Sequence, residues 1–140
     1  MSLFLLDTDT LTPVEQGHGV ALQHVNSRAI SEIALCTISV QEQMQGFLAA
    51  VNRARDEKQL ARAHEMLTRR LLPVWGRFAV LPFTEFAILR FEQLRSMRLD
   101  VGLMDLRIAA IAAENSMTVV TRNLRDFGRV PGLSTVDWSV

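Results

Sequence analysis

The sequence has a single cysteine and no net charge. Cys36 is the only cysteine among 140 residues, so no disulfide can form within the chain. Its apolar surroundings, IALCTISV, indicate a buried side chain rather than a reactive thiol. The formal net charge is zero, which excludes a global field that attracts polyanions. Lys58 is the only lysine beside fourteen arginines, a bias that fits phosphate contacts and equally fits a GC-rich coding sequence.

Long apolar runs are also lacking. No segment reaches the roughly 18 apolar residues that a membrane span needs. The opening MSLFLLDTD has no basic region before its first acid, unlike a signal peptide. Hydrophobic residues make up 49% and charged residues 21%, as in globular proteins. We therefore expect a single cytoplasmic domain over residues 1–140, with no membrane segment.

Short apolar runs alternate with amphipathic stretches along the chain. We expect strands at residues 3–6, 33–38, 77–83, 117–121 and 133–138. Between them the pattern predicts a helix over 11–31 that Gly17 and Gly19 interrupt, helices that begin at Ser39 and Glu57, and helices over 84–99 and 104–116. Residues 123–132 read as irregular. The alternation predicts an α/β fold with a mainly parallel central sheet of four to five strands flanked by helices.

Acidic residues cluster where such a sheet binds ligands. Asp7 and Asp9 follow the first strand, and Thr121 and Asn123 follow another; ligands of parallel sheets collect at these carboxyl ends. The further candidate acids are Glu42, Asp105 and Asp126. Carboxylates about 4 Å apart repel by about 4 kcal/mol at an effective dielectric near 20, so a shared pocket needs a cation or protonation. Oxygen ligands without cysteine or an HExxH pattern favour Mg²⁺ or Mn²⁺ over zinc, and His18, His24 and His64 read as surface residues.

Each acid also has a structural interpretation. Asp7 fits a turn or a helix N-cap, and Ser39 with Glu42 forms a candidate capping box in SVQE. Asp105 suits the first turn of a helix through the helix dipole, although an acid on a buried face needs a partner. Asp126 fits a surface ion pair. The arginines beside it are candidates either for that pairing or for phosphate contacts: Arg122, Arg125 and Arg129.

Several stretches together resemble the PIN-domain ribonucleases, specifically the VapC toxin type of bacterial toxin–antitoxin modules. They are FLLDTDT, TISVQEQMQG, VLPFTEFAILRFEQLR and VGLMDLRIAAIAAENSMTVVTRNLRDFGRVPGLSTVDW. The resemblance covers residues 3–138 and is weakest over 13–34 and 47–75. The family often has asparagine where Asp9 stands, and usually Thr-x-x-Glu-Leu around Glu42, where this chain has Ser39 and Gln43.

The resemblance implies a PIN-like three-layer domain and metal-dependent endonucleolytic cleavage of RNA. The acidic residues of the family correspond here to Asp7, Glu42, Asp105 and Asp126, which the resemblance implies are catalytic Mg²⁺ ligands. Asp9, Asn123 and Thr121 are possible assisting residues. It further implies a small antitoxin as partner and a homodimer. The segment WGRF and the helices over 57–75 could form an interface or belong to the core.

Two alternatives remain open from the sequence. LDTDTL also fits the opening motif of haloacid-dehalogenase-like phosphatases, in which Asp7 would be a nucleophile. That family needs a lysine to balance the phosphoaspartate, and Lys58 stands in a charged helical segment; the spaced acids Asp100 and Asp105 follow an amphipathic helix instead of a strand. The second alternative is a catalytically silent PIN domain that only binds a partner.

Overall fold

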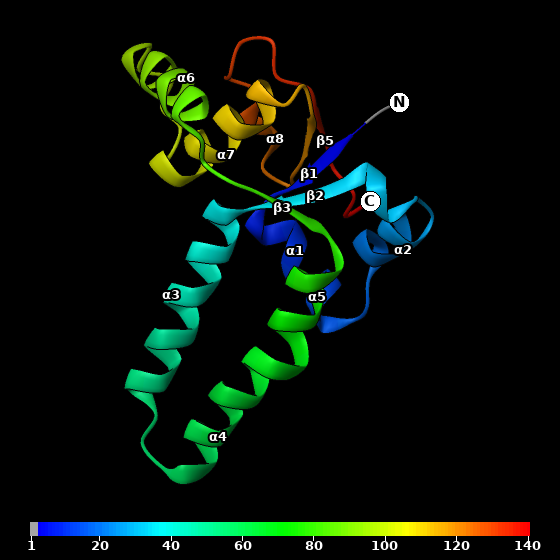
Figure 1. The fold of residues 1–140 in the computed structure, drawn as a ribbon, viewed down its shortest axis with the longest axis vertical. Helices are drawn as coiled ribbons and strands as arrows, with labels where there is room; N and C mark the ends of the chain where they lie inside the picture. The colour runs from blue at the N-terminus through cyan, green and yellow to red at the C-terminus, as the bar shows by residue number, and fades with distance from the viewer. Residues whose placement is uncertain (1–2) are drawn as a thin grey trace.

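A computed structural model describes residues 3–140 and contains a five-stranded parallel sheet (Figure 1). The strands run in the order β3-β2-β1-β4-β5, and all four pairings are parallel. Their bounds are β1 (Phe4–Leu6), β2 (Ile33–Cys36), β3 (Ala79–Leu81), β4 (Thr118–Val120) and β5 (Thr135–Val136). This confirms the expected α/β architecture. All carboxyl ends therefore meet along one edge, with β1 in the centre.

Helices cover both faces of the sheet. Alternate residues of a strand point to opposite faces, so Leu5 packs into one buried cluster and Leu6 into the other. The cluster around Leu5 is covered by α6 (Glu85–Ser96), α7 (Leu103–Glu114) and α8 (Leu124–Phe127). The cluster around Leu6 is covered by α1 (Thr8–Gln16), α2 (Val20–Asn26) and α5 (Leu72–Arg77). The result is three layers, with α6 to α8 on one side of the sheet and α1, α2 and α5 on the other (Figure 1).

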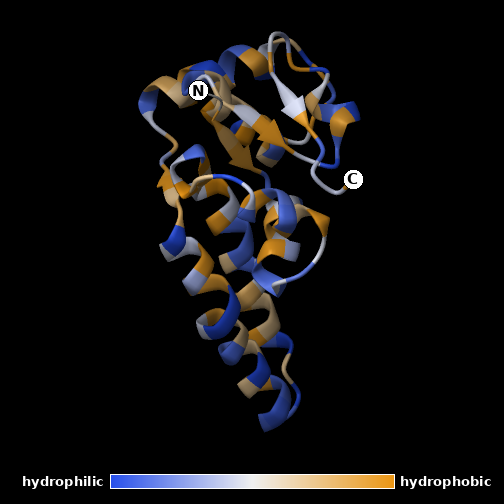
Figure 2. Cartoon of the chain, turned by 90° about the vertical axis from the view of Figure 1, so that its right-hand side faces the viewer, coloured by the Kyte–Doolittle hydropathy of each residue, from blue (hydrophilic) through white to orange (hydrophobic). Residues whose placement is uncertain are grey.

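A helical arm extends away from the sheet. It consists of α3 (Thr37–Arg53) and α4 (Glu57–Met66), joined to α5 through a π-helical turn, η2 (Leu67–Leu71). Pro73 has no amide hydrogen and its ring crowds the carbonyl four residues earlier, which explains the wider turn just before it. The far end of the arm is mostly hydrophilic, whereas the strands are hydrophobic (Figure 2). A short 3₁₀ turn, η1 (Ile30–Glu32), precedes β2.

Several predicted boundaries are wrong by a few residues. The helix expected to begin at Ser39 begins at Thr37 with Cys36 as its N-cap, so β2 is shorter than predicted. The segment expected to be irregular contains α8. The predicted interruption is confirmed, because α1 ends at Gly17, which has the left-handed φ of +78° that glycine adopts at low cost. Within residues 3–140, no helix has the combined length and apolar character required to cross a membrane.

Candidate active site

The candidate site lies where the carboxyl ends of β1, β2 and β4 meet. Asp7 directly follows β1, α3 begins directly after β2, and Thr121 directly follows β4. Because these strands are neighbours and parallel, their following residues lie side by side. This edge brings together segments that are more than a hundred residues apart in the chain.

Asp7 is almost fully buried, with 3% of its surface exposed. It is the N-cap of α1, and its Oδ1 accepts a 2.9 Å hydrogen bond from the Thr10 amide. Burial raises the pKa of Asp7, while hydrogen bonds from Thr121 and Thr10 oppose the increase. The capping interpretation is thus confirmed, and the same geometry holds the carboxylate at the sheet edge.

Glu42 projects from α3 toward α1. Its Oε1 accepts a 2.7 Å hydrogen bond from the hydroxyl of Thr8, which also lies 3.1 Å from Ser39 Oγ. Ser39 is completely buried in the first turn of α3, and the N-cap is Cys36, so the predicted capping box between Ser39 and Glu42 is wrong. Thr8 and Ser39 instead form a hydroxyl pair that fixes Glu42. No motif in the sequence marks either hydroxyl as a site residue, although Thr8 directly follows the strand-ending Asp7.

Asp105 shows most directly that the acids converge. It is half-buried in the first turn of α7, and its pKa is raised to about 6. Burial is the largest cause, followed by the negative charges of four other acids: Asp7, Glu42, Asp9 and Asp126. An acid on a buried face was expected to need a partner. The groups that face Asp105 are further carboxylates, so the ionised form is destabilised by its surroundings.

Asp126 is held by residues on either side of it. Asn123 is the N-cap of α8, and its Nδ2 donates a 2.9 Å hydrogen bond to Asp126 Oδ2. Arg129 Nη1 lies 3.2 Å from Asp126 Oδ1 and also donates to the carbonyl of Asp100 at 2.7 Å. The predicted ion pair of Asp126 therefore forms with Arg129. Arg122 and Arg125 are exposed and form no salt bridge with any residue in 3–140.

The donor chemistry fits a hard divalent cation. The gathered side chains supply only oxygen atoms, which Mg²⁺ and Mn²⁺ prefer, and a cation would relieve the repulsion on Asp105. Cys36 is buried, whereas His24 stacks on Trp138 and His64 packs edge to face against Phe47. No three histidine, cysteine or acidic side chains in residues 3–140 stand close enough together to form a complete metal cage. Binding would therefore draw the carboxylates inward.

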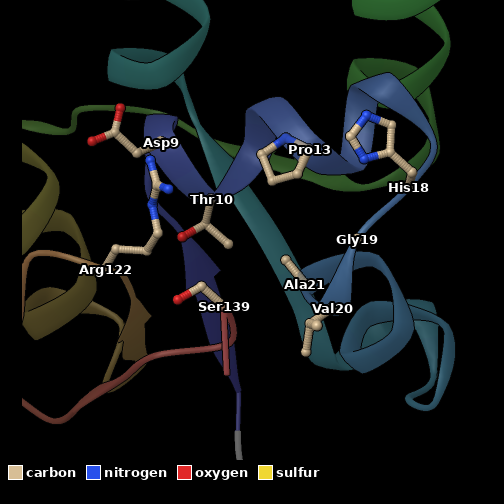
Figure 3. Close-up of a pocket in the computed structure, with 9 residues that line it drawn as sticks. All are labelled: Asp9, Thr10, Pro13, His18, Gly19, Val20, Ala21, Arg122 and Ser139. Atoms are coloured by element: carbon tan, nitrogen blue, oxygen red, sulfur yellow. The ribbon is translucent and has the colours of Figure 1, made fainter.

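An apolar hollow adjoins the acidic edge. Asp9 and Arg122 stand at one end, His18, Val20 and Ala21 at the other, and Thr10 and Ser139 between them (Figure 3). Pro13 and Gly19 complete its lining, and its volume is about 250 Å³. This hollow was not foreseen in the sequence, because its lining comes from α1, the start of α2 and two segments near the C-terminus.

Comparison with known proteins agrees with the fold. The family model described as PIN domain matches residues 6–133. The tRNA(fMet)-specific endonuclease VapC of Salmonella typhimurium is 27% identical over 142 residues, and the alignment covers 99% of each chain. DNA-bound VapBC from Salmonella typhimurium has a TM-score of 0.79 and 25% identity, covering 99% of both chains. FitAcB from Neisseria gonorrhoeae has a TM-score of 0.73 and 26% identity, covering 97% of this chain and 98% of its own.

Proposed function

We propose, from the premise that the chain belongs to the PIN domain family, that it is a metal-dependent endoribonuclease and the toxin of a VapC-type toxin–antitoxin module. The observation that carries this proposal is the environment of Asp105, which four other acids from three segments of the chain make unfavourable for negative charge. Such crowding of carboxylates at the carboxyl edge of a parallel sheet is typical of a cation site that acts on phosphate esters.

Four residues would hold the metal: Asp7, Glu42, Asp105 and Asp126. Asp9, Asn123 and Thr121 would assist them. A bound Mg²⁺ or Mn²⁺ would lower the pKa of a water molecule, position the scissile phosphate and stabilise the negative charge that develops as the phosphodiester is hydrolysed. By its resemblance to the family, the reaction would leave a 5′-phosphate on the product.

The surrounding hydrogen bonds would prepare these ligands. The Thr10 amide donates to Oδ1 of Asp7 and fixes the direction of this carboxylate, which would hold the metal. Thr8 orients Glu42 through its hydroxyl, and Asn123 with Arg129 fixes the two oxygens of Asp126. Partners of this kind set the direction of a metal ligand, and removing one costs about 10–100-fold in affinity or activity.

Exposed arginines would attract the RNA although the chain has no net charge. Arg122 and Arg125 follow β4 and lie close to the acidic edge in the sequence. Guanidinium groups form charge-assisted hydrogen bonds with phosphate oxygens. We assign the phosphate contacts to this pair, whereas Arg129 already contacts Asp126 and Asp100. A protein that cleaves RNA as proposed would act in the cytoplasm.

The proposed protein partners are a small antitoxin and a second copy of the chain. The full-length match to a VapBC structure supports the antitoxin. The segment WGRF is not a free interface: Phe78 is buried, and Trp75 Nε1 donates a 2.7 Å hydrogen bond to Gln43. More suitable apolar side chains for a homodimer project from α6, where Phe86 and Leu89 are 71% and 61% exposed.

The phosphatase alternative loses its support in the structure. Lys58 lies in α4, at the end of the arm farthest from the sheet (Figure 1). It is therefore remote from Asp7 and does not balance a phosphoaspartate there. The catalytically silent module remains the competing function that an experiment must exclude.

Cleavage of RNA by purified protein with and without Mg²⁺ tests the proposed function. Asp7→Asn is the informative variant, because asparagine is as good an N-cap as aspartate and leaves α1 intact. We expect it to abolish the Mg²⁺-dependent activity. Asp56→Asn is the matched control, since Asp56 caps α4 on the arm through the same type of contact. Equal cleavage by Asp7→Asn and the wild type would refute the assignment, and a wild type inactive toward varied RNAs would favour the silent module.

A further inference from the structure

We propose that the hollow between α1 and α2 is a nucleobase subsite, which receives an unstacked base next to the scissile phosphate. The inference rests on the proposed function and adds that the chain binds a base of the RNA substrate as well as its phosphate. The hollow is lined by Asp9, Thr10, Pro13, His18, Gly19, Val20, Ala21, Arg122 and Ser139 (Figure 3).

The size and polarity of the hollow suit a flat heterocycle. Its volume of about 250 Å³ lies below the roughly 300–1,000 Å³ of pockets that hold drug-sized ligands. Ala21 is buried and Val20 is 42% exposed, so the end away from Asp9 is an apolar floor. The hydroxyls on its walls are already engaged, since Thr10 Oγ1 donates to the Val120 carbonyl and Ser139 Oγ to Asp137. An apolar floor disfavours a phosphate group at this end.

The groups at the rim match the other parts of a nucleotide. His18 is exposed and presents an imidazole ring on one side, and the Arg122 guanidinium lies on the opposite side beside Asp9. Unstacked RNA bases stack on histidine rings and arginine planes, and the guanidinium can also contact a phosphate. Such stacking is sequence-tolerant, so the subsite would favour a base without dictating which one.

The position of the hollow connects it to the acidic edge. Asp9 lines the hollow and lies in the first turn of α1, two residues after Asp7, which caps that helix at the acidic edge. A phosphate held at the carboxylates would therefore place the neighbouring nucleoside over Thr10 and toward Ala21. Gly19 forms the turn at this end: its φ is +97°, a conformation that other residues rarely adopt, and it lies directly before α2.

The test is an NMR titration of the full chain in Mg²⁺ buffer. The probes are AMP, GMP, CMP and UMP, with ribose 5-phosphate as the base-free control. We expect the nucleotides to shift the amide resonances of Gly19, Ala21 and Ser139, and ribose 5-phosphate to leave them in place. Val20→Phe, at a partly exposed position, should fill the hollow and weaken binding by roughly 5–100-fold, the range expected for the loss of one stacked base.

Controls make each outcome decisive. His18→Ala removes a rim group without touching the floor and should also weaken nucleotide binding, whereas Leu60→Phe, at a similarly exposed apolar position on the arm, should not. Equal shifts from ribose 5-phosphate would overturn the subsite in favour of an anion contact. An absence of shifts at millimolar nucleotide would also overturn it, and a loss of antitoxin binding by Val20→Phe in that case would identify a protein-binding groove.

The titration is independent of cleavage. Nucleotide binding in the hollow without Mg²⁺-dependent cleavage would refute the proposed function and retain the subsite as a nucleotide-binding site. Cleavage without nucleotide binding in the hollow would refute the subsite alone.

Discussion

The hydroxyl of Thr8 donates a 2.7 Å hydrogen bond to Oε1 of Glu42 and so joins the first turn of α1 to α3 across the edge of the sheet. Thr8→Val keeps the shape of the side chain and removes this donor. We expect cleavage to fall by about 10–100-fold, because Glu42 loses the group that orients it. Steady-state cleavage with saturating Mg²⁺ measures the change.

Thr12→Val is the matched control for this substitution. Thr12 lies one turn later on α1, and its hydroxyl bonds only to the Thr8 carbonyl on an exposed face. Wild-type activity in Thr12→Val with reduced activity in Thr8→Val would assign the effect to Glu42. Similar losses in both variants would point to general weakening of α1 instead.

Asp105→Asn should abolish RNA cleavage and raise the stability of the folded protein. The pKa of Asp105 is raised from 3.8 to about 6, so the folded state binds a proton more tightly than the unfolded state. The free energy of unfolding should therefore fall as the pH rises through this window, and level off above it. In the asparagine variant the free energy of unfolding should not fall in this way, because residue 105 no longer titrates. The variant should therefore have a higher Tm than the wild type at pH 7 in EDTA, and it should not cleave RNA.

Added Mg²⁺ separates the metal site from simple relief of repulsion. Mg²⁺ should raise the Tm of the wild type at pH 7, because a ligand that binds only the folded state stabilises it. The increase should be smaller in Asp105→Asn. If both proteins respond equally to Mg²⁺, Asp105 is not a metal ligand.

Glu15 provides a second pH effect outside the acidic edge. Burial raises its pKa from 4.5 to about 7, and the hydrogen bond from Gln43 opposes this increase. Its Oε1 accepts from Gln43 Nε2, whereas Oε2 is buried without a hydrogen-bond partner among residues 3–140. The ionised form is thus destabilised, and stability should decline between pH 4.5 and about 7.

Glu15→Gln should remove this decline and raise the Tm at pH 8, with little change at pH 4. Thermal unfolding across this pH range measures it, and Glu57→Gln on the exposed arm is the control. The Mg²⁺ response should stay that of the wild type, since Glu15 is not among the proposed ligands. An unchanged pH profile would show that water reaches the carboxylate.

Arg122→Gln and Arg125→Gln should weaken RNA binding and flatten its dependence on salt. Each phosphate contact that is lost lowers the slope of log K against log salt by roughly 1. Anisotropy titrations of a labelled RNA at several salt concentrations measure the slope. Arg53→Gln, at the far end of α3, should leave it unchanged. If a variant with both substitutions keeps the wild-type slope, neither arginine belongs to the RNA-binding surface of the protein.

Leu89→Glu tests the proposed homodimer. Leu89 and Phe86 are exposed apolar side chains on α6, and a charge at a buried interface position is unfavourable. Light scattering should give a dimeric mass for the wild type and a monomeric mass for the variant. Leu48→Glu, at a 53% exposed position on α3, is the control. A wild type that is monomeric at high concentration would refute the homodimer.

The sheet and its acidic edge could be predicted from local patterns. The buried strands are short apolar runs, and a strand that ends in Asp7 places that residue at the carboxyl edge whatever the details of packing. Asp105 stood out because it interrupts an otherwise apolar helix face. These features depend on periodicity and chain order, which the sequence carries directly.

Other features depend on how separate elements pack. Thr37 and Ile38 are β-branched and extended the apparent strand, but α3 begins there because Ser39 turns inward toward Thr8. Arg129 could not be distinguished from its neighbouring arginines until the fold brought the Asp100 carbonyl beside it. The hollow at Gly19 likewise needs the chain near Ser139 as one wall.

The central place of β1 has a consequence for synthesis on the ribosome. β1 pairs with β4, so one edge of β1 stays unpaired until the segment around Thr118 has been synthesised. Asp126 is synthesised later still. Contacts this distant in the chain form late, and domains form as units once their parts have emerged. A nascent or prematurely terminated chain would therefore lack an assembled catalytic edge, and the producing cell would be exposed to the nuclease only after translation is nearly complete.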